Sequence, residues 1–122
     1  MKIVYIVDFA IPSKSASSVH VMKMCDAFAQ EGHSVTLVCL SNSDFKDSAV
    51  FSQYDVKPGF SIRPVQVPNI KGRLFLFAVR ANRIIRACKP DLVYSRSILS
   101  SLLPAREFPI IVEAHKPVWE YG

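Results

Sequence analysis

Short, uninterrupted runs of apolar residues recur along the chain and predict the strands of a sheet. The first, Ile3 to Val7, and the second, Val35 to Leu40, are rich in β-branched side chains and do not alternate with polar residues. Such continuous runs are typical of central strands that are covered on both faces of a sheet. Three later strands are predicted: a weaker one at Ser61–Pro68, and short ones at Leu92–Tyr94 and Ile110–Val112.

Between these runs, two segments have the apolar spacing of an α-helix. The first precedes Gly32, a typical C-cap residue, and its apolar positions are Val21, Met24, Cys25, Phe28 and Ala29. The second ends before Lys89 and Pro90, because proline cannot continue a helix. Its apolar positions are Leu74, Phe77, Ala78, Ala81, Ile84, Ile85 and Cys88. A short helix is predicted near Ile98–Arg106, and the polar segment Ser41–Phe60 is predicted to be irregular.

The order of these elements, β-α-β-β-α-β-α-β, predicts an α/β fold. Alternation of this kind calls for a Rossmann-like, open, mostly parallel twisted sheet of about five strands, with helices on both faces. A chain of 122 residues is long enough for one hydrophobic core, so we expect a single domain over residues 1–122. The sequence stops soon after a predicted strand, where such a sheet is expected to carry another helix, so we expect the native protein to continue.

Composition narrows the class of protein. Half of the residues are hydrophobic and 20% are charged, as in folded globular domains. The formal net charge of +5 favours acidic partners such as phosphate groups, nucleic acid or anionic lipid, although solubility alone also tolerates such a charge. The basic residues are dispersed along the sequence and no recognition motif is present, so no nucleic-acid partner is expected.

The cysteines and the apolar segments indicate where the protein resides. Cys25, Cys39 and Cys88 form no CxxC pair and sit in apolar patterns, as expected for small core residues of a protein in a reducing compartment. No stretch approaches the ~20 apolar residues of a membrane span, and the N-terminal run is too short for a secretory signal. We therefore expect a cytoplasmic location.

Candidate binding residues follow the predicted strands, because ligands of open α/β sheets bind at the carboxyl ends of the strands. The loop Pro12–Ser18 leads into a helix whose N-terminus offers unpaired N–H groups to a phosphate or carboxylate. The alternative is that Ser17 or Ser18 simply caps that helix. Neither GxGxxG nor GxxxxGK[ST] occurs, which argues against a dinucleotide-binding or P-loop enzyme.

Histidine and charged residues at these strand ends are further candidates. His20 lies near the loop, or is an ordinary surface histidine, whereas His33 follows Gly32 at the opposite edge of the sheet. Glu113 and His115 alternate after the last strand, so both side chains leave on the same side. Arg96 follows the preceding strand and is a candidate anion ligand, or an ordinary exposed arginine. No cluster of metal ligands is visible.

One helix face combines basic and apolar residues. Arg80, Arg83 and Arg86 lie away from the predicted apolar face, together with Phe75 and Val79. A face of this kind can rest on anionic lipid, which makes peripheral contact with the inner face of the membrane one option. The other option is a solvated face whose long side chains cover their own surface.

Three segments resemble glycosyltransferase family 4: SSVHVMKMCDAFAQEGHSVTLV, with its junction of helix, Gly-His and strand, PDLVYSRS, and FPIIVEAHKPVWE. The resemblance runs from Met1 to about Tyr121. It implies the N-terminal, acceptor-side domain of a GT-B enzyme, in which two Rossmann-like domains face each other and the C-terminal one, missing here, holds the nucleotide-sugar donor. The implied acceptor is a carbohydrate or a lipid-linked molecule, and no cofactor is expected.

The resemblance also implies a retaining transfer from a nucleotide-diphosphate sugar, inactive without the donor-binding domain. It assigns His115 to the transferring sugar or acceptor, as the catalytic candidate. Ser17 and Ser18 would contact the diphosphate, although family members often have Gly-Gly there, and the acceptor pocket would be formed by His20, Arg96 and Glu113. The alternative is a non-catalytic Rossmann-like module that binds a partner or a nucleotide.

Overall fold

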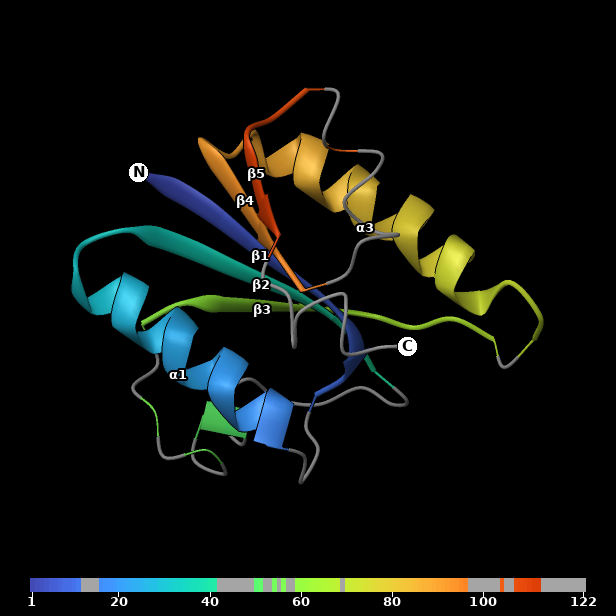
Figure 1. The fold of residues 1–122 in the computed structure, drawn as a ribbon, viewed down its shortest axis with the longest axis horizontal. Helices are drawn as coiled ribbons and strands as arrows, with labels where there is room; N and C mark the ends of the chain where they lie inside the picture. Colours follow the sequence, from blue (N-terminus) through green and yellow to red (C-terminus); the bar gives the residue numbers. More distant parts are fainter. Residues whose placement is uncertain are drawn as a thin grey trace, which may run out of the picture.

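The computed structural model describes residues 1–11, 16–41, 50–51, 54, 56, 59–68, 70–96, 104 and 107–112. Its centre is a five-stranded sheet in the order β3-β2-β1-β4-β5, and every neighbouring pair is parallel (Figure 1). The elements are β1 (Lys2–Ala10), α1 (Ala16–Gln30), β2 (Ser34–Leu40), β3 (Ser61–Val65), α3 (Arg73–Cys88), β4 (Leu92–Ser95) and β5 (Ile110–Val112). The predicted Rossmann-like α/β fold is confirmed. The helix predicted near Ile98–Arg106 lies outside the described residues except at Pro104.

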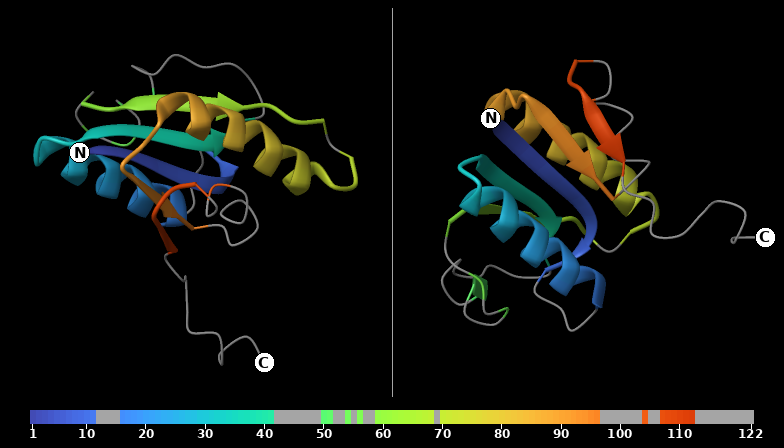
Figure 2. Two further views of the ribbon diagram at one scale, coloured as in Figure 1. Left: turned by 90° about the horizontal axis from the view of Figure 1, so that it is seen from above. Right: turned by 60° about the vertical axis from the view of Figure 1, so that its left-hand side comes forward.

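The central strand β1 supplies side chains to a hydrophobic core on each face of the sheet. Ile3, Tyr5 and Val7 belong to one core and Val4 and Ile6 to the other, because successive side chains of a strand point to opposite faces. This is why the sequence of β1 is apolar without alternation. Helix α1 packs on the first core and α3 on the second, so the helices cover opposite faces (Figure 2).

Helix α3 is amphipathic and has well-defined ends. Phe77, Ala78, Ala81 and Ile85 are its buried residues, as the spacing predicts. Lys89 closes the helix in the left-handed region, with φ 50° and its N–H donated to the Ile85 carbonyl at 3.0 Å. Pro90 then prevents further helix.

The structure corrects the prediction for the segment between β2 and β3. Val50, Phe51 and Tyr54 are helical and buried, and Phe60 packs edge-on against Phe51 with ring centroids 4.9 Å apart. These residues join the core on the α1 side of the sheet. The sequence prediction weighed the many polar residues of this segment and missed that its few apolar ones recur at helical spacing.

Two phenylalanines of α3 provide a test of this packing. Phe77 is fully buried and Phe75 is 63% exposed. Phe77→Ala should lower the free energy of unfolding by about 3–5 kcal/mol, because it leaves a cavity between helix and sheet. Phe75→Ala should change it by less than about 0.5 kcal/mol. Urea unfolding followed by circular dichroism measures both, and equal losses would contradict the packing.

Two backbone positions at the ends of α3 provide a second test. Gly72, at the N-cap, has φ 79°, and a Cβ added there would meet no atom within 4 Å. Gly72→Ala should therefore destabilise the protein by about 1–2 kcal/mol through backbone strain alone. Lys89→Gly should instead stabilise it by roughly 0.5–1 kcal/mol, because glycine adopts positive φ without strain. Shifts of the thermal midpoint in the same direction for both variants would rule out this account.

Candidate functional site

The strand order reverses at β1, which marks the ligand-binding position of an open α/β sheet. From β1 the chain builds β2 and β3 on one side and then crosses to β4 and β5 on the other. Strands β1 and β4 stay in register up to the pair Ile6 and Ser95, and the Arg96 N–H donates to the Ile6 carbonyl at 3.1 Å. Ligands in such folds bind outside the carboxyl ends of the strands at this switch point.

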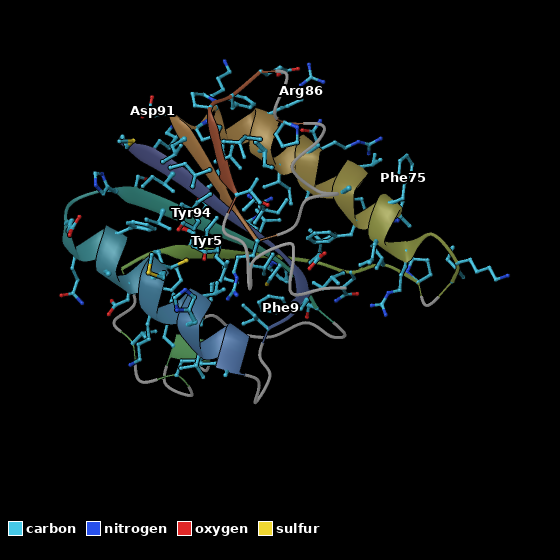
Figure 3. The ribbon with its side chains drawn as sticks, in the orientation of Figure 1. Tyr5, Phe9, Phe75, Arg86, Asp91 and Tyr94 are labelled. Atoms are coloured by element: carbon cyan, nitrogen blue, oxygen red, sulfur yellow. The ribbon has the colours of Figure 1, made fainter. Side chains whose placement is uncertain are left out.

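At the same place, the pairing of β1 with β2 becomes irregular. Its register with β2 shifts between Ile6 and Ala10, and the Ile11 N–H donates to the Leu40 carbonyl at 3.1 Å. Asp8 and Phe9 fall in this irregular stretch and are half-buried. The carboxyl end of β1 therefore places an acidic and an aromatic side chain beside the switch point, with Phe9 near the start of α1 (Figure 3).

Helix α1 begins at this edge and directs its N-terminus toward it. The helix starts at Ala16, so Ser17 and Ser18 lie inside its first turn, and the expectation that one of them is the capping residue is corrected. The first N–H groups of a helix have no partner within it and carry its positive dipole end. Both serines therefore lie at the helix end that generally attracts anions. The side chain of Ser17 lies outside the described residues.

The Ser18 side chain has a structural role. It is fully buried, and its hydroxyl accepts a hydrogen bond from the Tyr54 hydroxyl at 3.1 Å. The hydrogen bond joins the start of α1 to the helical residues between β2 and β3.

Three buried serines of the described part of the chain lie at this edge. They are Ser18 in the first turn of α1, Ser41 directly after β2, and Ser95 at the end of β4. Burying a hydroxyl is costly unless it is hydrogen-bonded, so three buried serines at one edge indicate a polar environment there. Arg96, half-buried, adds a positive charge next to Ser95.

The remaining predicted residues divide between the two edges of the sheet. His20 is exposed on the second turn of α1, on the carboxyl side. His33 lies at the amino edge, with its Nδ1 3.0 Å from the N-terminal ammonium group of Met1, so the two histidines cannot share a site. Glu113 and His115 lie outside the described residues. The strand that they follow, β5, ends beside Ser95.

Sequence reasoning missed two features behind this edge. Tyr54, the partner of Ser18, was not singled out, although its spacing from Val50 and Phe51 was a usable signal. The rings of Tyr5 and Tyr94 lie 4.9 Å apart on adjacent strands (Figure 3). The ring of Phe28 in α1 lies 5.8 Å from that of Tyr94. This aromatic group links β1, β4 and α1 and fixes the positions from which the edge residues emerge.

Among the described residues, the cysteines offer no reactive thiolate, and the His, Cys, Asp and Glu side chains form no metal site. Cys25 and Cys39 are buried and Cys88 is half-buried, and all three are free thiols. Burial raises the pKa of the Cys25 thiol, and the nearby Cys39 raises it further, so Cys25 is not a thiolate nucleophile. No group of three His, Cys, Asp or Glu side chains there is arranged to hold a metal ion. None of the helices so described is long and apolar enough to cross a bilayer.

These observations define an open Rossmann-like domain whose ligand position, at the β1/β4 switch point, has polar side chains and a helix N-terminus. The model of glycosyltransferase family 4 matches residues 17–121. The chain therefore belongs to glycosyltransferase family 4, and this membership supports a glycosyltransferase-like role that uses a sugar donor and an acceptor. No curated protein sequence matches the chain.

Solved structures share the fold at low sequence identity. The C-terminal domain of a hydrogenase from Pyrococcus furiosus matches with a TM-score of 0.58 and 17% identity, covering 94% of this chain and 91% of that chain. A universal stress protein family member from Burkholderia pseudomallei matches with a TM-score of 0.46 and 16% identity, covering 88% and 94%. A universal stress protein in complex with cAMP has a TM-score of 0.43 and 12% identity, covering 92% and 98%. At this low sequence identity, the likeness to the hydrogenase domain shows only that the fold is shared. The two universal stress proteins, with TM-scores below 0.5, support no conclusion about this chain.

The Ser18–Tyr54 hydrogen bond can be tested by a double-mutant cycle. Tyr54→Phe and Ser18→Ala should each reduce stability by about 0.5–1.5 kcal/mol. The double variant should lose less than the two together, with a coupling of at least about 0.5 kcal/mol, because either change alone breaks the bond. Urea unfolding of the four proteins measures this.

Ser95→Ala is the matched control for that cycle. Ser95 is a buried serine in register with Ile6, whose side chain lies on the opposite face of the sheet from Tyr54. Its effect should add to that of Tyr54→Phe. If the effects of Ser18→Ala and Tyr54→Phe also add, the two hydroxyls do not interact.

Proposed function

We propose that this chain is the acceptor-side domain of a retaining glycosyltransferase. The enzyme would transfer a sugar from a nucleotide-diphosphate sugar to a carbohydrate or lipid-linked acceptor, and this domain would be inactive without a C-terminal, donor-binding domain. The observation that carries the proposal is the match to glycosyltransferase family 4 over residues 17–121. The polar carboxyl edge at the switch point supports it, since a hydroxylated acceptor needs hydrogen-bonding partners.

The reaction requires little chemistry from the protein itself. The acceptor hydroxyl oxygen forms a bond to the anomeric carbon while the bond from that carbon to the diphosphate breaks, and the acceptor proton passes to a diphosphate oxygen. The sugar carries oxocarbenium character in between, and its configuration is retained. The domain therefore contributes chiefly by orienting the acceptor and by stabilising the negative charge that develops on the diphosphate.

The proposed residues divide into those that contact the diphosphate and those that contact the acceptor or the transferring sugar. Ser17 and Ser18 lie in the first turn of α1, at the positive end of the helix dipole, so this end of the helix would lie toward the diphosphate across the cleft between the two domains. Arg96, after β4, and His20, on α1, would bind the acceptor, together with Glu113. His115 would hydrogen-bond the transferring sugar or the acceptor hydroxyl and hold it for attack.

The location of the enzyme is also a proposal. We place it in the cytoplasm, where nucleotide sugars are available, with peripheral contact at the inner face of the membrane. The three free cysteines agree with a reducing compartment. A lipid-linked acceptor would be reached from that position.

The proposal is tested in the full protein that contains this domain together with its donor-binding domain. Release of nucleoside diphosphate is measured with UDP-, GDP- and ADP-sugars in the presence of candidate acceptors. His115→Ala should lower kcat by about 100-fold, the loss typical of removing one hydrogen-bonding group from the transition state. Arg96→Gln should lower kcat/KM by about tenfold or more through loss of a charge-assisted contact.

His33→Ala is the matched control, because His33 lies at the amino edge beside the chain terminus and should not affect transfer. Unchanged transfer in His115→Ala would remove the role proposed for that residue. Product of inverted anomeric configuration, read by NMR, would contradict the retaining mechanism. Absence of release with every donor, from a folded protein, would favour the non-catalytic binding module.

A further inference from the structure

A group of exposed apolar side chains lies at the start of α3 and in the turn before it. Ile70, Leu74 and Phe75 are 59%, 41% and 63% exposed, and Phe75 points away from the sheet (Figure 3). Seven large hydrophobic side chains of the described residues are exposed, and these three fall within six consecutive positions. Scattered exposed apolar residues are ordinary, whereas a group marks a surface that contacts something apolar.

The backbone holds this apolar group in place. The Arg73 N–H donates to the Ile70 carbonyl at 3.2 Å, and the Leu76 N–H donates to the Gly72 carbonyl at 3.0 Å. Gly72 makes the turn between them with its positive φ. Because the turn is already ordered, inserting these side chains into an apolar environment would cost little backbone entropy.

The same part of the chain carries the protein's positive charge. Between Asp55 and Asp91 the sequence has no Asp or Glu, and its basic residues are Lys57, Arg63, Lys71, Arg73, Arg80, Arg83, Arg86 and Lys89. These are eight of the fifteen basic residues, so the remaining seven are outnumbered by ten acidic ones. The basic residues are therefore concentrated, which corrects the view from the sequence that they are dispersed.

The structure places this charge beside the apolar group. Lys71, Arg80 and Arg83 are exposed around and along α3. The Arg80 guanidinium donates to the Gln66 carbonyl, and Arg86 lies 3.4 Å from Glu107 near the other end of the helix. Lys71 adjoins Ile70 in the chain, and Arg83, eight positions after Phe75, shares a helix face with it. Arg86 is partly neutralised by Glu107.

The start of α3 also projects past the sheet. The segment after β3 extends beyond the carboxyl edge before it turns into α3 (Figures 1 and 2). Leu74 lies on the same side of the helix as the buried Phe77 and Ala78, as residues three and four positions apart do, yet it is exposed. The first turn of α3 therefore has no sheet beneath it and can enter another surface.

We infer that the surface formed by Ile70, Lys71, Leu74, Phe75, Arg80 and Arg83 docks on an anionic lipid bilayer. The apolar side chains enter the boundary between headgroups and acyl chains, and the cations meet lipid phosphates. Lipid is favoured over nucleic acid because two of the three apolar anchors are aliphatic and offer nothing for a base to stack on. This surface belongs to the same carboxyl edge as the candidate site, so docking would turn that site toward the membrane.

The binding test uses the 122-residue chain and vesicles, and it does not depend on sugar transfer. We expect the chain to float with vesicles that contain about 30% phosphatidylglycerol and to leave pure phosphatidylcholine vesicles largely unbound, because the cations need anionic lipid. Phe75→Ala should weaken binding about tenfold, and Arg83→Gln about fivefold. Salt at about 0.5 M should weaken it further, because it screens the charges.

Matched controls come from α1, on the other face of the sheet. Val19→Ala removes an exposed apolar side chain and Lys23→Gln an exposed basic one, and neither should change binding. Equal effects of these controls, or no effect of Phe75→Ala on a folded protein, would overturn the proposal. So would a dimer in analytical ultracentrifugation that Phe75→Ala dissolves, or binding of a single-stranded oligonucleotide in place of vesicles.

Discussion

The burial of β1 on both of its faces is the constraint on which the rest of the structure depends. A strand with no polar face must be covered by a helix layer on each side, and it must have hydrogen-bonding neighbours at both edges. Helices α1 and α3 cover the two faces of β1, and strands β2 and β4 pair with its two edges. The chain adds β2 at one edge of β1 and later β4 at the other edge. The switch point is therefore a consequence of the same constraint.

The candidate site arises where that constraint ends. At Ile6 the two ladders of β1 stop being regular. Beyond this residue, buried serines and a helix N-terminus lie beside the apolar Val7 and Ile11. The core therefore supplies rigidity behind the site, through Tyr5, Tyr94 and Phe28, while the edge supplies polarity. Such a division suits the acceptor-binding role that we propose, in which the domain orients a flexible hydroxylated molecule.

Much of the fold could be predicted from the sequence, because apolar runs and helical spacing report burial directly. The positions of β1, β2, α1 and α3 and the parallel sheet follow from those patterns. The helical backbone of Val50, Phe51 and Tyr54 did not, because their signal is short and surrounded by polar residues. Capping was misjudged at Ser17 and Ser18 because helix ends depend on local backbone geometry, which composition does not report.

The candidate site was predictable only as a set of strand ends. Its members are known to share an edge because strands are parallel, but the sequence cannot say which hydroxyl faces a ligand. Ser18 shows this: its hydroxyl is turned inward by Tyr54, a residue from a different part of the chain. Likewise, the crowding of basic residues near α3 becomes meaningful only when the structure shows Phe75 exposed beside them.

The pairing of β1 with β4 has a consequence for synthesis. Ile3 pairs with Leu92, so β1 must wait for one of its two neighbours until the chain has been made as far as Leu92. Strand β2 arrives early and can pair with β1 on one edge, but the other edge stays open through the translation of β3 and α3. A nascent chain with such an apolar open edge is exposed to aggregation. We therefore expect slow translation or chaperone binding in this interval to influence the yield of folded protein.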